Sequence, residues 1–158
     1  MRSALDVGCG TGLAGEAFRS VVSGALVGID LSPQMAARAE AREGVYSRVL
    51  VGDLEESITV AAQAQVSATA GHAFDLVLFA DVLIYFGDLT GPLKLATAAL
   101  APHGLVGLTL ERPSEADALA LSDQEWKWKL EGSGRYLLDL FLLIFFAYLR
   151  VVCLLFSR

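Results

Sequence analysis

The sequence has few of the residues that build disulfide frameworks or metal sites. Only two cysteines, Cys9 and Cys153, and two histidines, His72 and His103, occur among its 158 residues. None of them has a partner at the spacing of a metal site, and two cysteines do not make a disulfide framework. We therefore expect no metal ion, and we interpret Cys9 as a small space-filling residue.

Positive charge is scarce as well. Twelve Lys and Arg stand against 18 Asp and Glu, which gives a net charge of −6. Proteins that bind nucleic acid usually present a basic face, so we expect no nucleic-acid partner. No signal peptide is recognisable, because Met1-Arg2-Ser3 leads directly into the first apolar run. These features predict a reduced, cytoplasmic setting.

Apolar runs of strand length alternate with helical patterns as far as about residue 111. Strands buried on both faces read as continuous apolar runs, so the alternation predicts an α/β fold with a parallel sheet and helices on both faces. The helix over 13–22 is expected to bury one face that carries Leu13, Ala17, Phe18 and Val21. Segment 54–71 has weak periodicity and is interpreted as a loose helix between two loops. We expect strands over 4–7, 25–29, 47–51, 74–80 and 105–110, and further helices over 34–42 and 89–100.

Glycines and aspartates follow the ends of these strands. Gly8-Cys9-Gly10-Thr11-Gly12 follows the first strand, and Asp30, Asp53 and Asp81 follow the next three along the chain. The carboxyl ends of parallel strands meet at one sheet edge, which predicts a single ligand site there. An acidic residue about twenty positions after the glycines indicates a nucleotide, because a carboxylate can accept hydrogen bonds from both ribose hydroxyls. The Gly-x-Gly-x-Gly spacing suits a ligand without a pyrophosphate better than a dinucleotide.

These motifs together resemble those of the class I S-adenosylmethionine-dependent methyltransferases. Leu5–Gly12 (LDVGCGTG) resembles the family's first motif, Gly28–Met35 (GIDLSPQM) its ribose-binding motif, and Gly52–Leu54 (GDL) its adenine-edge position. The segment 74–83 resembles the fourth strand and its exit. The closest likeness is to type 11/12 methyltransferases, of the small-molecule kind associated with TPR proteins. These also carry a Ser-Gly-Arg-Tyr stretch like Ser133–Tyr136, so the likeness covers about residues 4–136.

The resemblance implies a Rossmann-like, doubly wound parallel sheet of about five strands in the order 3-2-1-4-5. It implies methyl transfer from S-adenosylmethionine to an unidentified small-molecule acceptor, with no catalytic residue assigned. The glycines would pass under the methionine part, beside the carboxylate that orients the amino group. The resemblance implies four groups of cofactor-binding residues. They are Gly8, Gly10, Gly12 and Asp6 at the methionine part; Asp30, Leu31 and Met35 at the ribose and adenosine; Asp53 and Leu54 at the adenine; and Ala80 and Asp81 where the cofactor meets the acceptor.

The chain departs from the family pattern at both ends. The family usually has residues before the first strand and closes its sheet with antiparallel strands. Residues 137–156 are apolar on every face except at Asp139 and Arg150. We therefore expect a methyltransferase domain over 1–136 that is incomplete at both ends, without C-terminal antiparallel strands, and a helical tail over 137–158.

The tail leaves alternatives open for the function. As a helix it is long enough to span a bilayer, which would make the protein membrane-associated. It would otherwise be a hydrophobic helix capping the sheet, or a segment foreign to the fold. A non-catalytic or truncated relative of the methyltransferases and, more distantly, a nicotinamide-dependent oxidoreductase are the other candidate functions.

Overall fold

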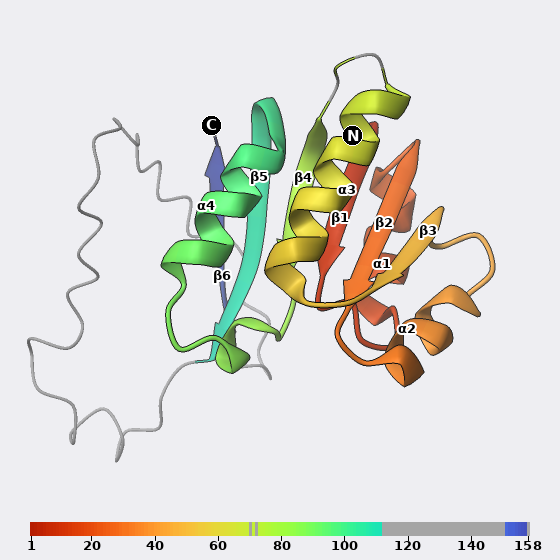
Figure 1. Cartoon of the computed structure of the whole chain (residues 1–158), viewed down its shortest axis with the longest axis horizontal. Helices are drawn as coiled ribbons and strands as arrows, with labels where there is room; N and C mark the ends of the chain where they lie inside the picture. The colour runs from red at the N-terminus through yellow and green to blue at the C-terminus, as the bar shows by residue number, and fades with distance from the viewer. Residues whose placement is uncertain (70, 72, 112–150, 158) are drawn as a thin grey trace, which may run out of the picture.

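In the part of the chain that the structure describes, six strands pair in one sheet in the order β3-β2-β1-β4-β5-β6 (Figure 1). The computed structural model describes residues 1–69, 71, 73–111 and 151–157. The first five strands are parallel, which confirms the predicted α/β fold and the order 3-2-1-4-5. The strands are β1 (Ser3–Val7), β2 (Ala25–Asp30), β3 (Arg48–Val51), β4 (Phe74–Phe79), β5 (Leu100–Glu111) and β6 (Val151–Ser157).

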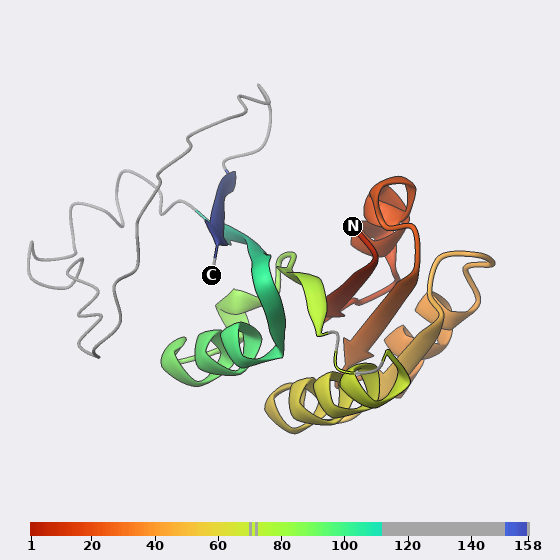
Figure 2. The same ribbon diagram turned by 90° about the horizontal axis from the view of Figure 1, so that it is seen from above.

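Helices cover both faces of the sheet, as Figure 2 shows from above. Helices α3 and α4 lie side by side on one face, and α1 lies on the opposite face. Two parallel strands that follow one another in the chain need a long crossover connection, which is usually a helix. This is why strands and helices alternate along the chain. The helices are α1 (Leu13–Phe18), α2 (Pro33–Glu40), α3 (Leu54–Ala68) and α4 (Thr90–Ala99), with 3-10 turns η1 (Arg19–Val21) and η2 (Leu83–Tyr85).

The core has two layers because side chains alternate across the strands. In β1, Leu5 and Val7 belong to the cluster under α3 and α4, whereas Ala4 belongs to the cluster on the other face. All five residues of β1 are buried. A central strand covered on both faces explains the uninterrupted apolar runs of the sequence.

The C-terminal residues 151–157 form a strand, β6, antiparallel to β5. This corrects two predictions: an antiparallel strand is present, and the helix expected over 137–158 is wrong for residues 151–157. An apolar run without periodicity does not distinguish a strand from a buried helix. The edge of β5 decides the outcome: its backbone N–H and C=O groups pair with residues 151–157, and a segment can make these hydrogen bonds only in an extended conformation. Residues 137–150 lie outside the described residues.

The segment after Asp53 is one continuous helix of 15 residues, α3, where a loose helix between loops was predicted. The Asp53 carboxylate caps it by accepting hydrogen bonds from the backbone N–H groups of Glu55 and Glu56, at 3.0 and 3.1 Å. Ile58 and Ala61 are buried at helical spacing. The buried stripe of α3 is narrow and consists partly of small residues, so the sequence shows only weak apolar periodicity.

The buried face predicted for the helix over 13–22 is wrong. Leu13 is 65% exposed and Val21 is 51% exposed, whereas Gly15 and Val22 are buried. The helix also ends at Phe18 and continues as the 3-10 turn η1. Among the described residues, no helix is both long and apolar enough to cross a membrane.

Candidate functional site

The glycine loop between β1 and α1 has a backbone that only glycine adopts without strain. Gly8, Gly10 and Gly12 have φ angles of +71°, +53° and +84°. A Cβ atom on Gly8 would lie 2.2 Å from Cγ2 of Val82, so the loop packs against the chain leaving β4. A Cβ atom on Gly10 would have no atom within 4 Å. The loop is therefore packed at Gly8 and open at Gly10.

Asp30 ties the end of β2 to this loop. Its Oδ2 accepts a hydrogen bond from the backbone N–H of Gly10 at 2.7 Å, and its Oδ1 accepts one from Ser32 at 2.8 Å. The spacing of twenty residues read from the sequence thus corresponds to a direct contact. A carboxylate offers about four acceptor positions, so two remain for a ligand.

Asp6 is a buried carboxylate beneath the loop. It has no exposed surface, its Oδ2 accepts a hydrogen bond from the Tyr46 hydroxyl at 2.6 Å, and its Oδ1 has no hydrogen-bond partner in the part of the chain that the structure describes. Burial raises the pKa of Asp6 to about 6, helped by the charge of Asp30 and opposed by the Tyr46 hydrogen bond and the nearby backbone N–H of Gly15, which lies outside hydrogen-bond geometry for Oδ1. A buried carboxylate oxygen without a donor costs free energy, so a cationic ligand group would be well bound there.

Cys9 fills the space between the loop and β2. It is 5% exposed, and its backbone N–H donates to the carbonyl of Ile29 at 2.8 Å. A Cβ atom on Gly28 would lie 3.0 Å from its Sγ. Burial raises the pKa of Cys9 to about 12, so the thiol is inert at neutral pH. This burial confirms the interpretation of Cys9 as a space-filling residue.

Asp53 and Leu54 follow β3 at the same edge of the sheet. The backbone N–H of Gly52 donates to the carbonyl of Asp30 at 3.1 Å, which holds this turn beside the end of β2. The Asp53 Oδ1 is already occupied by the two helix-capping bonds of α3, and Leu54 is half-buried. Asp53 thus has a structural role that the sequence interpretation did not include.

Asp81 lies where the chain leaves β4. Its φ angle is +55°, which is uncommon for a residue with a side chain. Thr109 of β5 fixes it on two sides: the Asp81 N–H donates to Thr109 Oγ1 at 2.7 Å, and that hydroxyl donates to Asp81 Oδ1 at 2.9 Å. Ala80, next to it, is partly exposed. Residues held in such conformations often mark functional sites.

Leu31 and Met35 flank the loop after β2. Leu31 is 67% exposed and Met35 is 39% exposed, so both present apolar surface at this edge. Ser32 begins α2 by accepting a hydrogen bond from the Met35 N–H, with Pro33 at the first helical position. Exposed apolar side chains beside a glycine loop are suited to cover a flat ring.

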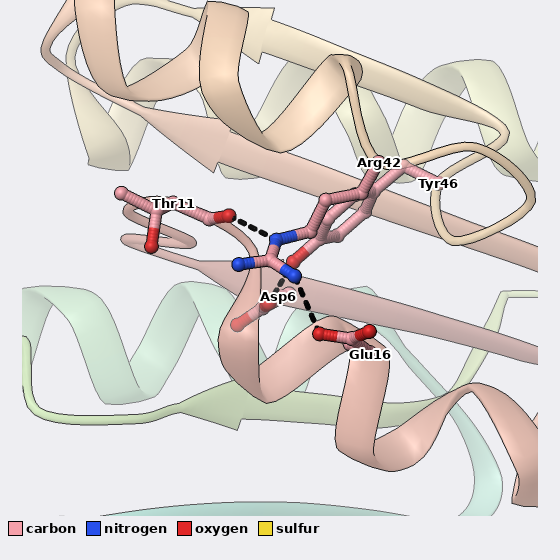
Figure 3. A network of polar contacts seen from close by, with 5 residues as sticks. All are labelled: Asp6, Thr11, Glu16, Arg42 and Tyr46. Carbon is pink, nitrogen blue, oxygen red and sulfur yellow. Dashed lines mark hydrogen bonds and ion pairs between the residues drawn. The ribbon is translucent and has the colours of Figure 1, made fainter.

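Two residues that the sequence interpretation missed come from the connection between α2 and β3. Tyr46 hydrogen-bonds Asp6, and Arg42 donates from Nε to the carbonyl of Thr11 at 2.5 Å and pairs with Glu16 (Figure 3). The signal for Tyr46 in the sequence was Gly15, which stands outside the Gly-x-Gly-x-Gly pattern. A Cβ atom there would lie 2.1 Å from the Tyr46 hydroxyl oxygen.

The predicted residues thus gather at one edge of the sheet. The register pairs Val7 with Ile29 and Asp30 with Val51, so the strand ends are level. Within the described residues, no group of three His, Cys, Asp or Glu side chains is placed to hold a metal ion. Whether these residues bind a cofactor stays a prediction, because their contacts here are with one another.

Comparison with known proteins agrees with this geometry. The sequence profile of a methyltransferase-domain family matches residues 5–106. A ubiquinone biosynthesis O-methyltransferase of Azorhizobium caulinodans is 31% identical over 138 residues, which are 84% of this chain and 50% of the relative. The chain therefore spans about half the length of that relative.

Solved structures are similar as well. An amino pentose methyltransferase of Micromonospora echinaspora, with S-adenosylmethionine bound, is 28% identical, with a TM-score of 0.51 over 67% of this chain and 41% of that protein. A Pseudomonas syringae crystal structure assigned as a methyltransferase is 22% identical. It has a TM-score of 0.61 and covers 99% of this chain and 87% of its own, which shows a shared fold.

Proposed function

This chain belongs to the class I S-adenosylmethionine-dependent methyltransferase family, and we propose that it binds S-adenosylmethionine at the glycine loop and methylates a small-molecule acceptor. The proposal rests on one observation at the glycine loop: a buried carboxylate oxygen that is unpaired among the described residues lies beneath it, and open space lies above it. Beneath it, Asp6 keeps a buried carboxylate oxygen without a donor, and above it the space at Gly10 is open.

The charge of Asp6 fits the amino acid end of the cofactor. A methionine ammonium group can supply the missing donor to Oδ1, and ionised partners make the stronger kind of hydrogen bond. Gly10 lets this part of the cofactor approach the backbone, and Gly8 and Gly12 hold the required turn. A neutral ligand at this place would leave the Asp6 charge uncompensated.

The adenosine end fits the remaining residues. Asp30 has acceptor capacity for two ribose hydroxyls, and Leu31 and Met35 present apolar surface for the base. Asp53 retains Oδ2 for the adenine amino group, and Leu54 lies next to it along the chain. The negative charge of Asp30 would repel a 2′-phosphate, which argues against an NADP-like ligand.

The chemistry needs alignment more than a dedicated base. A bound S-adenosylmethionine supplies an already activated methyl carbon, so the protein must hold donor and acceptor in line and exclude water. Ala80 and the fixed Asp81 are placed to border the acceptor, and we assign neither as a catalytic acid or base. That an amino pentose methyltransferase shares this fold supports a small molecule as the acceptor class. The cytoplasmic setting expected from the sequence stays a prediction.

Calorimetric titration with S-adenosylhomocysteine, followed by transfer assays with labelled S-adenosylmethionine and a panel of small hydroxyl and amine compounds, tests the proposal. We expect 1:1 binding and transfer to at least one compound. Absence of binding would refute the proposal, and binding without transfer to any acceptor would favour the non-catalytic relative. Reduction of NAD would favour the oxidoreductase instead.

A further inference from the structure

Tyr46 lies in a slot lined by three glycines. A Cβ atom on Gly15 would lie 2.1 Å from the Tyr46 hydroxyl oxygen, and one on Gly12 would lie 2.9 Å from Cε2 of its ring. On Gly28 it would lie 3.1 Å from Cε1. Any larger side chain at Gly12 or Gly15 would therefore displace the ring, because real Cβ contacts are not this short. The slot holds Tyr46 in one position.

The contact that this position produces is with Asp6. The Tyr46 hydroxyl donates to Oδ2 at 2.6 Å, while Oδ1 has no donor in the described part of the chain. The carboxylate can rotate about its last bond, and a hydrogen-bond donor fixed beside one oxygen limits that rotation. The hydroxyl therefore determines which oxygen is occupied and which is left.

Arg42, four residues earlier, connects the same segment to the loop itself. Its Nε donates to the carbonyl of Thr11, and its guanidinium pairs with Glu16 of α1 (Figure 3). The α2–β3 connection thus contacts β1, the glycine loop and α1 at once. A movement of Tyr46 would be transmitted to each of them.

We propose that Tyr46 is a positioning residue for cofactor binding: it fixes Oδ2 of Asp6, so that Oδ1 remains available to the ammonium group of the cofactor. This inference rests on the proposed function, since it concerns the same site. Tyr46 acts through Asp6 and need not touch the cofactor. A tyrosine that only packed the loop would stabilise the fold without changing how Asp6 titrates.

That difference defines the test. The titratable groups that face Asp6 are Tyr46 from the α2–β3 connection, Cys9 from the loop and Asp30 from β2. Of these, the Tyr46 hydroxyl lowers the pKa of Asp6, whereas the charge of Asp30 raises it. In Tyr46→Phe the ring stays in its slot, the hydroxyl is lost and the pKa of Asp6 rises. If the cofactor binds to ionised Asp6, then as the pH is lowered its binding should begin to weaken at a higher pH in Tyr46→Phe than in the wild type.

The experiment measures the dissociation constant of S-adenosylhomocysteine between pH 5 and 8 for the full chain. We expect Tyr46→Phe to shift the acid limb, the fall in affinity as the pH is lowered, upward by about one pH unit, so that binding weakens about twofold at pH 7 and approaches a tenfold loss at pH 5. Tyr85→Phe is the matched control: it removes the same hydroxyl from a ring that is 80% exposed, and its profile should match the wild type.

A second variant displaces the Tyr46 hydroxyl instead of removing it. Gly15→Ala places a methyl group against the Tyr46 oxygen, so it should move the acid limb in the same direction. In the Tyr46→Phe background it should move the limb no further, because the hydroxyl is already absent.

The outcomes separate this proposal from the proposed function. If the wild type binds S-adenosylhomocysteine and Tyr46→Phe has the same affinity and the same pH dependence, the positioning role is refuted and the methyltransferase proposal stands. Loss of stability alone, with an unchanged limb, would also refute it and show a packing role. If the wild type binds no S-adenosylhomocysteine at any pH, both proposals are wrong.

Discussion

Replacement of Asp30 tests the ribose assignment most directly. In Asp30→Ala, both backbone hydrogen bonds of the carboxylate are lost, those from Gly10 at 2.7 Å and from Ser32 at 2.8 Å, together with the proposed ribose contacts. A hydrogen bond to a charged group contributes about 1.5–3 kcal/mol. We therefore expect the affinity for S-adenosylhomocysteine to fall by about 10- to 100-fold, as measured by calorimetry at pH 7.5.

Loss of the loop contacts has to be separated from loss of the ribose contacts. Asp30→Asn keeps the size of the side chain and one oxygen that can accept from a backbone N–H, so the loop should change less than in the alanine variant. Urea unfolding of both variants measures the structural part. Because Asp30 is half-buried, we expect that part to be about 1–2 kcal/mol for Asp30→Ala and smaller for Asp30→Asn.

Asp88 offers a matched control. Its Oδ1 accepts from the Thr90 N–H at 2.8 Å, the same two-residue pattern as between Asp30 and Ser32, at an exposed place away from the glycine loop. Asp88→Asn should leave the affinity unchanged. If the Asp30 variants fold and bind S-adenosylhomocysteine as tightly as the wild type, Asp30 does not hold the ribose and the reasoning fails.

Three further predictions concern the residues around the loop. Gly8→Ala should lower the free energy of unfolding in urea by about 2–4 kcal/mol, because strain at φ +71° adds to the clash with Val82. Gly44→Ala, with φ +73° and no neighbour within 4 Å, should cost only the strain, and equal losses in the two variants would contradict the packing argument. Asp6 has a pKa raised from 3.8 to about 6, so the native state binds more protons between these values. Its contribution to stability is complete below pH 4 and is lost, about 3 kcal/mol in all, as the pH rises to about 6. Unfolding measured in steps of pH should show this slope in the wild type and not in Asp6→Asn. Cys9 should react with iodoacetamide at pH 8 about a thousandfold more slowly in the folded protein than in urea, with peptide mapping to assign the thiol; fast reaction would show that the loop opens.

Local sequence signals were sufficient to predict the parallel part of the sheet and the edge at which the candidate site lies. Continuous apolar runs that end in Gly8 or in Asp30 identify strands whose carboxyl ends meet, because the twist and handedness of the connections allow few other arrangements. The turn at Ser32-Pro33 was equally local, since a capping hydroxyl and a fixed proline φ angle begin a helix wherever they occur.

Local pattern was insufficient where a distant partner decides the conformation. The run over 151–157 has no periodicity, and the edge of β5 makes it a strand. The apolar side chains of Leu13 and Val21 have helical spacing, yet they face away from the sheet because Gly15 packs there against Tyr46.

Contacts between residues far apart in the sequence establish how the candidate site is held. Tyr46 lies forty residues from Asp6 in the sequence, and a hydrogen bond over such a distance has no local signal. The same is true of Thr109 in β5 and Asp81 in the turn after β4, which are 28 residues apart. Burial under the loop gives the Asp6 carboxylate its raised pKa and leaves one oxygen without a donor. These properties arise from packing and desolvation, which depend on residues brought together by the fold.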